Sequence, residues 1–190
     1  MTRARHSRPR RRAFSVRARL RRRRLGRELV AMARTDQEAR RDWRDDPEQA
    51  ERVERLDRHH TERLRELIDR FGWPGPEVAG VAGSQAAWLL VQHADHDPEF
   101  QRRCLGLLED AVARDEAEPR QVAFLTDRVR IHEGQLQRFG TQLRLEEGRL
   151  RPIPIEDPDG VDERRRSAGL GPLDDYLRDT ERSYGLLPSD

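Results

Sequence analysis

The segment GVAGSQAAWLLVQHA, residues 80–94, places the strongest constraint on the fold of this chain. Small and apolar residues occupy nearly every side of it, whereas the chain as a whole is 39% charged and has a mean hydropathy of -1.02. A helix that is apolar all round is typical of a position covered by the rest of the protein. We therefore predict a central, fully covered helix over residues 78–94, with Trp88, Leu89 and Val91 in the core.

Four further segments carry apolar residues at helical spacing and are predicted to be helices. They span residues 25–43, 48–71, 98–113 and 120–139. The pair Asp97-Pro98 supplies a capping side chain and a proline at the first helical position, which defines the start of the fourth helix. The GWPGP sequence that follows the second helix predicts a turn.

Beyond Gly140 the apolar period changes from helical spacing to alternation. The stretch TQLRLEEGRLRPIP turns at Glu147-Gly148, which predicts a two-stranded β-hairpin over about residues 141–154. A short helix stopped by Gly169 and a last helix near residues 173–185 complete the chain. The predicted fold class is mainly α: a single-domain helical bundle around a buried central helix, with one small hairpin after the fifth helix.

Charge is distributed unevenly along the chain. Residues 1–27 hold thirteen arginines and no acid, whereas residues 28–190 hold twenty-five arginines and thirty-six acids, so the net charge of +2 combines +13 with −11. We predict a disordered arginine-rich arm over residues 1–24, a helical domain over 25–185 and a tail over 186–190. One interpretation of the arm is that it binds nucleic acid or an acidic membrane surface. The other is an unstructured tail, or a start codon assigned too far upstream.

The chain lacks the usual signals for export or membrane insertion. No segment reaches the roughly 18 consecutive apolar residues of a transmembrane helix. The sequence Arg11-Arg12-Ala13-Phe14 resembles the start of a twin-arginine export signal, but VRARLRRRR follows where an apolar region is required. The single cysteine, Cys104, has no partner for an internal disulfide. These features predict a cytoplasmic protein without a membrane span.

An ordered set of short motifs resembles a bacterial domain family of unknown function. The motifs are RELVAMARTDQEAR, GWP, QHAD, DRV, GQLQRFGTQ, EDPDGVDERR and GLGPLDDY, over residues 28–176 or so. The resemblance implies a fold shared by small bacterial proteins, and it implies no particular activity. In the family pattern the position of Phe139 is more usually tyrosine, so a phenol acid at that position is not available in this chain.

His93 is the strongest candidate for chemistry. Its imidazole can act as an acid or a base near neutral pH, and it closes an otherwise apolar helix. Asp127, on the predicted fifth helix, is the carboxylate expected to orient it, so these two residues are the predicted catalytic pair. The competing interpretation is a core histidine satisfied by a carboxylate, with Asp127 in a buried ion pair with Arg128 or Arg40.

Side chains that are expected near this pair and can hydrogen-bond without reacting are the candidates for substrate binding. They are Asp36, Arg40, Arg128, Gln135, Thr141 and Gln142. Those that flank Gly140 can bind an amide, a carboxylate or a sugar without bringing charge into a pocket. They can equally cap carbonyl groups where the chain reverses after a helix. We predict that His93, Asp127 and Gln135 converge on one cavity with Gln142 at its rim.

A metal site at the motif HADHD is a weaker alternative. His93, His96 and Asp97 have the spacing to share one ion. However, Asp97 already has a capping role, and no matched histidine–carboxylate pair occurs on a second helix. No metal is therefore predicted, and the sequence identifies no other cofactor.

Three functions are consistent with these patterns. The favoured prediction is a cytoplasmic acid/base enzyme that acts on a small polar or peptide-like substrate through His93 and Asp127. The first alternative is a non-catalytic ligand-binding or protein-interaction domain, whose polar residues form a buried network that fixes helix register. The second is a nucleic-acid-associated protein that uses residues 1–24. No nucleotide-binding glycine loop or nucleophile elbow points to a particular reaction.

Overall fold

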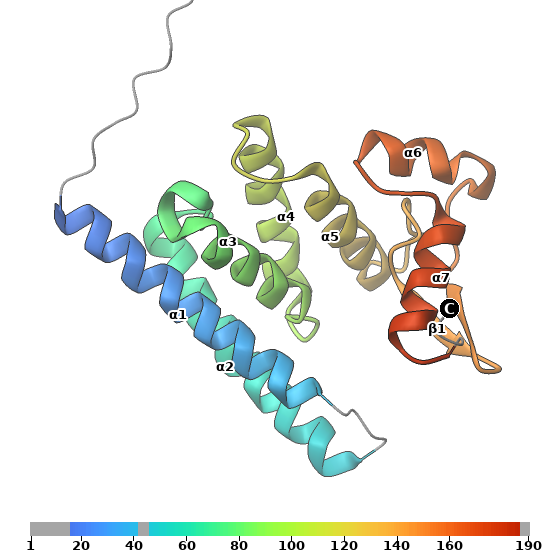
Figure 1. Cartoon of the computed structure of the whole chain (residues 1–190), viewed down its shortest axis with the longest axis horizontal. Helices are drawn as coiled ribbons and strands as arrows, with labels where there is room; N and C mark the ends of the chain where they lie inside the picture. Colours follow the sequence, from blue (N-terminus) through green and yellow to red (C-terminus); the bar gives the residue numbers. More distant parts are fainter. Residues whose placement is uncertain (1–15, 42–45, 187–190) are drawn as a thin grey trace, which may run out of the picture.

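The computed structural model describes residues 16–41 and 46–186. Helices account for most of these residues, and two short strands form an antiparallel hairpin (Figure 1). The elements are α1 (Val16–Arg40), α2 (Pro47–Phe71), α3 (Pro76–Gln92), α4 (Pro98–Ala113), α5 (Pro119–His132), β1 (Leu143–Glu146), β2 (Arg149–Pro152), the short 3-10 helix η1 (Pro158–Gly160), α6 (Val161–Ser167) and α7 (Leu173–Ser183). The prediction of a mainly α fold with a hairpin after the fifth helix is confirmed. Within these described ranges, no helix is both long and apolar enough to cross a membrane.

Helices α1 and α3 run side by side and pack closely because glycines meet at their contact (Figure 1). A Cβ on Gly26 would lie 2.1 Å from the carbonyl oxygen of Ala79, and a Cβ on Gly83 would lie 2.8 Å from the Cα of Gly26. Two helices can approach so closely only where the side chains are absent. The small residues of α3 therefore serve helix–helix contact as well as burial.

One face of α3 is open, contrary to the prediction of a helix covered on all sides. Leu90 and Val91 are buried, but Val81 is 65% exposed, and Trp88 and Leu89 are only half-buried. The assignment of Val91 to the core is confirmed, whereas Trp88 and Leu89 pack against the core but are only partly covered. The small residues of α3 permit close packing with α1 on one side of the helix. The face of α3 that lies between α1 and α5 is left uncovered.

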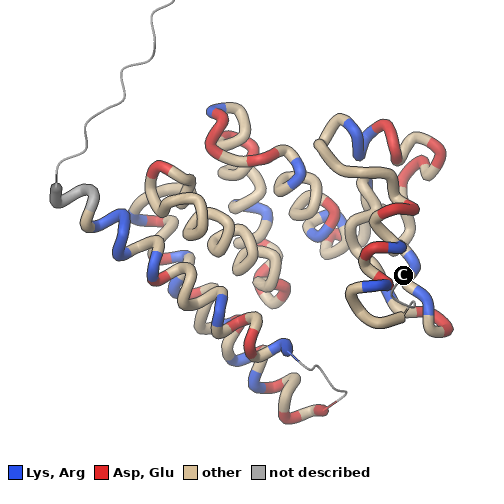
Figure 2. The backbone as a smooth tube through the Cα atoms, viewed as in Figure 1, with Lys and Arg blue, Asp and Glu red and all other residues tan. Residues whose placement is uncertain are grey.

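The start of α1 extends into the segment predicted as an arm. The helix begins at Val16, and the Arg22 guanidinium donates a hydrogen bond to the carbonyl oxygen of Pro76 at the start of α3. Figure 2 shows basic residues gathered at this end of α1. Residues 1–15, and also Trp43 of the predicted first helix, lie outside the described ranges. Nucleic-acid binding by the arm therefore stays a prediction.

Helix α5 ends at His132 and does not continue to residue 139 as predicted. Gly134 adopts a left-handed conformation with a φ of 72°, and the amide of Gln135 donates to the carbonyl oxygen of Arg130 at 2.8 Å. Glycine commonly ends helices in this way. The apolar spacing continues past this glycine as far as Phe139, which is why periodicity alone overran the end of the helix.

The hairpin and the last helices form the C-terminal part of the fold. Strand β1 pairs with β2 so that Leu145 lies opposite Leu150. Glu181 of α7 is buried and accepts hydrogen bonds from the Arg149 guanidinium at 2.7 Å and from the amide of Leu150 at 2.9 Å. These bonds lower the pKa of the Glu181 carboxyl. They attach the second strand of the hairpin to α7.

Candidate functional site

A buried carboxylate and a histidine meet where α1 and α3 end. Nδ1 of His93 lies 2.8 Å from Oδ2 and 3.0 Å from Oδ1 of Asp36. Asp36 is fully buried, whereas the His93 side chain keeps 20% of its surface exposed. The close packing of α1 against α3 brings Asp36 and His93 together, because the C-terminal ends of the two helices lie next to each other. The partner of His93 is therefore Asp36, which the sequence had placed among the substrate-binding candidates.

Asp36 belongs to a chain of hydrogen-bonded charges. Arg40 donates to Oδ1 of Asp36 at 2.6 Å, and Gln37 donates to Oδ2 at 2.9 Å. The second terminal nitrogen of Arg40 lies 2.7 Å from both carboxylate oxygens of Asp57 on α2. Burial opposes ionisation of Asp36, but the bonds and charges of His93, Gln37 and Arg40 outweigh it and lower its pKa. Burial raises the pKa of Asp57 despite its bonds to Arg40.

This arrangement fixes the protonation pattern of the imidazole. An ionised carboxylate can only accept, so the nitrogen that faces Asp36 carries the proton. No residue in the described ranges makes a hydrogen bond to Nε2 of His93. In the neutral ring this nitrogen is therefore the one that can accept a proton. A carboxylate that holds one ring nitrogen also stabilises the imidazolium that forms when the other nitrogen takes a proton.

Asp127 does not contact His93, and the prediction that it orients the histidine is wrong. It is fully buried, and its carboxylate accepts from backbone amides in the loop after α5. The amide of Arg138 lies at 2.6 Å, that of Phe139 at 3.0 Å and that of Thr141 at 2.9 Å, and the Thr141 hydroxyl donates at 2.9 Å. Asp127 is therefore the anchor of a tight loop. Hydrogen bonds from backbone amides do not depend on which side chains the donor residues carry, so the sequence does not reveal them.

Gln137 completes this anchor, and sequence reasoning missed it. It is fully buried, and its side chain accepts from the amide of Gln142 at 3.0 Å and donates to the carbonyl oxygens of Gln142 and Ile153. Gly140, with a φ of 66°, turns the chain between them. The glutamine-rich sequence at 135–142 is thus largely a device that shapes the loop. The available signal was its position within the GQLQRFGTQ motif.

The predicted site residues fall into two groups and do not form one site. Asp36 and Arg40 gather around His93. Arg128, Thr141 and Gln142 instead line a cavity of about 530 Å³ between α5, the hairpin and α7. Gln135 joins neither group, because it lies on the exposed loop after α5, where it donates to Glu133 at 3.2 Å. The predicted convergence of His93, Asp127 and Gln135 on one cavity is therefore wrong.

Arg128 connects the second group to the end of α3. Its Nη1 lies 2.8 Å and 2.7 Å from the two carboxylate oxygens of Asp95, two residues after His93. Its Nε is buried and has no acceptor in the described part of the chain. The expected ion pair of Arg128 with Asp127 is not formed, since Asp95 takes that place.

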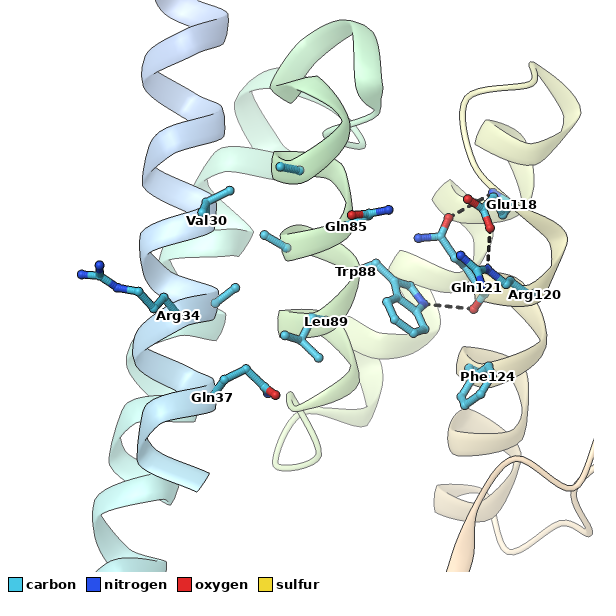
Figure 3. Close-up of a pocket in the computed structure, with 13 residues that line it drawn as sticks. Val30, Arg34, Gln37, Gln85, Trp88, Leu89, Glu118, Arg120, Gln121 and Phe124 are labelled. Carbon is cyan, nitrogen blue, oxygen red and sulfur yellow. Dashed lines mark hydrogen bonds and ion pairs between the residues drawn. The ribbon is translucent and has the colours of Figure 1, made fainter. Parts of the chain in front are cut away.

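A second hollow of about 650 Å³ lies over the open face of α3 (Figure 3). Val30, Arg34 and Gln37 of α1 form one wall and the start of α5 forms the other, while Trp88 and Leu89 lie on the floor. We call this hollow the α1–α5 groove. The indole of Trp88 donates to the carbonyl oxygen of Gln121 at 3.2 Å. Gln37 ends the groove and is the residue whose amide donates to Asp36, so the groove adjoins the His93 network.

Comparison with known proteins gives a family but no close relative of known activity. A model described as a family of unknown function, DUF6624, matches residues 23–188. The chain belongs to this family. No curated protein and no solved structure shows significant similarity. The matched range contains the His93 network, the Asp127 loop and both hollows, so each of these features lies within the family domain.

Asp97, a member of the alternative metal site, has other partners in the structure. Asp97 accepts from the amide of Phe100 at 3.0 Å, as a helix cap does, and also pairs with Arg65. Among the residues that the structure describes, no group of three or more His, Cys, Asp or Glu side chains is placed to hold a metal ion.

Proposed function

We propose that this member of the family is an acid–base enzyme in which His93 transfers protons and Asp36 orients it. The observation that carries the proposal is the 2.8 Å contact from Nδ1 of His93 to a fully buried carboxylate, in a side chain that keeps 20% exposure. A histidine that served only the core would be expected to have both nitrogens satisfied and no accessible surface. Asp36 takes the role that the sequence analysis assigned to Asp127.

The proton transfer uses the two nitrogens of His93 differently. Nε2 takes a proton from a water molecule or from a substrate hydroxyl or amide, while Nδ1 keeps its bond to Asp36. The imidazolium so formed lies beside a carboxylate, and Arg40 keeps that carboxylate ionised. As the atom that has lost this proton attacks the substrate, one substrate bond breaks, and Nε2 returns the proton to the group that leaves. Positioned proton transfer of this type contributes on the order of a hundred- to ten-thousand-fold in rate.

The α1–α5 groove supplies a place for a small polar or peptide-like substrate near this histidine. Gln37 offers an amide to the groove and is bonded to Asp36. Leu89 on the groove floor precedes His93 by about one turn of α3. The floor of the groove therefore lies about one helical turn from His93, which does not itself line it.

Turnover of model compounds tests the proposal. We would assay p-nitrophenyl acetate, p-nitrophenyl phosphate and amino-acid p-nitroanilides with the wild type, His93→Gln, Asp36→Asn and His96→Gln. His96 lies in the same loop and makes no hydrogen bond or ion pair with a carboxylate in the described ranges, so it is the matched control. We expect His93→Gln to lower turnover by at least about a hundred-fold, while His96→Gln has no effect. Full turnover by folded His93→Gln contradicts the proposal.

A non-catalytic binding domain is the second candidate, and the groove itself favours it. Its lining is mainly apolar and does not include His93. Under this interpretation the Asp36 network fixes the register of α1 against α3. Ligand binding would then be abolished by Leu89→Asp in the groove and retained in His93→Gln, whereas the enzyme proposal requires His93 for turnover.

A further inference from the structure

The cavity between α5, the hairpin and α7 has a polar end and an apolar end. Its volume of about 530 Å³ lies within the range of small-molecule sites. Gln142 and Tyr176 both bond to Thr141, and we call the part of the lining formed by these three residues with Phe124 and Arg128 the polar end. We call the rest of the lining, which includes the paired Leu145 and Leu150, the apolar end: Leu143, Leu145, Leu150, Thr180, Tyr184 and Leu186. None of these residues takes part in the Asp36–His93 network.

The polar end offers donors, and none of the described residues that line it is an acid. Arg128 uses Nη1 for Asp95 and its Nε is buried, so it contributes to the cavity chiefly through the positive charge of its guanidinium. Gln142 uses its amide nitrogen to donate to the Thr141 hydroxyl at 3.1 Å. The Tyr176 hydroxyl donates to the carbonyl oxygen of Thr141 at 3.0 Å. Among the described lining residues Arg128 is thus the one formally charged side chain, which favours a ligand that brings acceptor oxygens.

The apolar end exposes side chains that the fold itself does not cover. Leu145 is 62% exposed and Tyr184 is 72% exposed, and both border the cavity. Leu150, opposite Leu145 in the hairpin, is half-buried. Covering such surface is favourable by roughly 25 cal/mol per Å² of apolar area. A ligand with a hydrocarbon body would cover it.

The polar end is rigid before any ligand arrives. Asp127 and Gln137 hold the loop that presents Thr141 and Gln142. Buried Arg165 adds a bond from Nη1 to the carbonyl oxygen of Phe139 at 2.7 Å. Binding groups supported in this way lose little freedom when a ligand binds. The cavity is therefore built, and is not a gap left by loose packing.

We propose that this cavity binds an amphiphilic monocarboxylate with a hydrocarbon chain of medium length. The carboxylate lies against Arg128 and the amide of Gln142, and the chain extends along Leu143, Leu145 and Leu150. A cationic head is disfavoured because none of the described lining residues is an acid. Asp95 competes with the ligand for Arg128, so removing its charge strengthens binding. The inference is independent of the acid–base proposal, because the described lining residues of the cavity include none of the Asp36–His93 network and share Phe124 alone with the α1–α5 groove.

Isothermal titration of the full chain with octanoate, octanol and octylamine tests the head group. We expect octanoate to bind at least about ten-fold more tightly than octanol, since a charged hydrogen bond contributes roughly 1.5–3 kcal/mol. Octylamine should bind more weakly than either. Equal affinity for octanoate and octanol overturns the assignment of the polar end, and no binding of any of the three overturns the site.

Three variants locate the binding. Arg128→Gln should weaken octanoate binding about ten-fold and leave octanol binding unchanged. Asp95→Asn should strengthen octanoate binding, which a loss of fold would not produce. Leu145→Asp, at an exposed position where a polar residue does not disturb the core, should weaken both ligands. Arg120→Gln in the α1–α5 groove is the matched control, and a loss of octanoate binding in that variant would place the site elsewhere.

Discussion

Asp36 and Asp127 are both fully buried aspartates, yet they differ in their hydrogen-bond partners and therefore in their roles. Asp36 faces ionisable side chains, namely His93 and Arg40, and its histidine partner keeps a path to solvent. Asp127 faces backbone amides and one hydroxyl, none of which changes charge with pH. Burial of a carboxylate therefore says little about function until its partners are known. An ionisable partner that reaches solvent favours a catalytic role for the buried aspartate. Partners that are all backbone amides favour a structural role.

The largest effect that separates the two aspartates is expected for Asp127→Asn. The amide group would present a donor to backbone N–H groups that need acceptors, and it would lose charged bonds that contribute roughly 1.5–3 kcal/mol each. We expect a loss of about 3 kcal/mol or more in the free energy of unfolding, measured with urea. Asp159→Asn, at an exposed position, is the control. A change of less than about 1 kcal/mol would remove Asp127 from the role of loop anchor.

Asp36→Asn should destabilise the protein less, by about 2 kcal/mol, because Arg40 keeps its bonds to Asp57 and an asparagine oxygen can still accept from His93. The same urea experiment measures it. If Asp36→Asn costs as much as Asp127→Asn, both aspartates are architectural, and the contrast between the two regions fails.

Acid pH should reduce the contribution of Asp36 to the free energy of unfolding. Its pKa is lower in the folded protein than in the unfolded chain, so the unfolded chain binds the proton more readily. Its stabilisation is therefore present above the unfolded pKa, near pH 4, and is lost as the pH falls through the folded pKa. The difference in unfolding free energy between wild type and Asp36→Asn should shrink over that window. A difference that grows as the pH falls would reverse the assigned sign.

The smallest effect on stability is expected for His93→Gln. The side chain is partly exposed, and glutamine can still donate to Asp36, so the cost should stay below about 1 kcal/mol. A thermal melt measures this value independently of any substrate. A large loss of stability would indicate that His93 has a structural role, as Asp127 does, and would weaken the acid–base proposal.

The sequence predicted those elements whose boundaries have local causes. Asp97-Pro98 starts α4 at the predicted residue because the cap and the proline are neighbours in sequence. The hairpin turns at Glu147-Gly148, where both residues have positive φ. The end of α5 was missed because Gly134 interrupts an apolar spacing that continues beyond it.

The site was predicted less well, because its contacts join residues far apart in sequence. His93 was correctly selected as a histidine with a carboxylate partner, but spacing alone could not show that the partner is Asp36 on α1. Gln137 was passed over in favour of Gln135 because both carry the same side chain within one motif. Only the three-dimensional path of the loop distinguishes the buried amide from the exposed one.

The loop from Gln137 to Gln142 has a consequence for how the domain opens. This loop is bonded at the same time to Asp127 of α5, Arg165 of α6 and Tyr176 of α7. Each of these helices must therefore break a bond to the shared loop before it can detach. Such segments exchange their amide hydrogens with solvent deuterium only when the whole cooperative unit unfolds. The amide of Thr141, although it lies outside any helix or strand, should therefore be among the slowest in the protein to exchange.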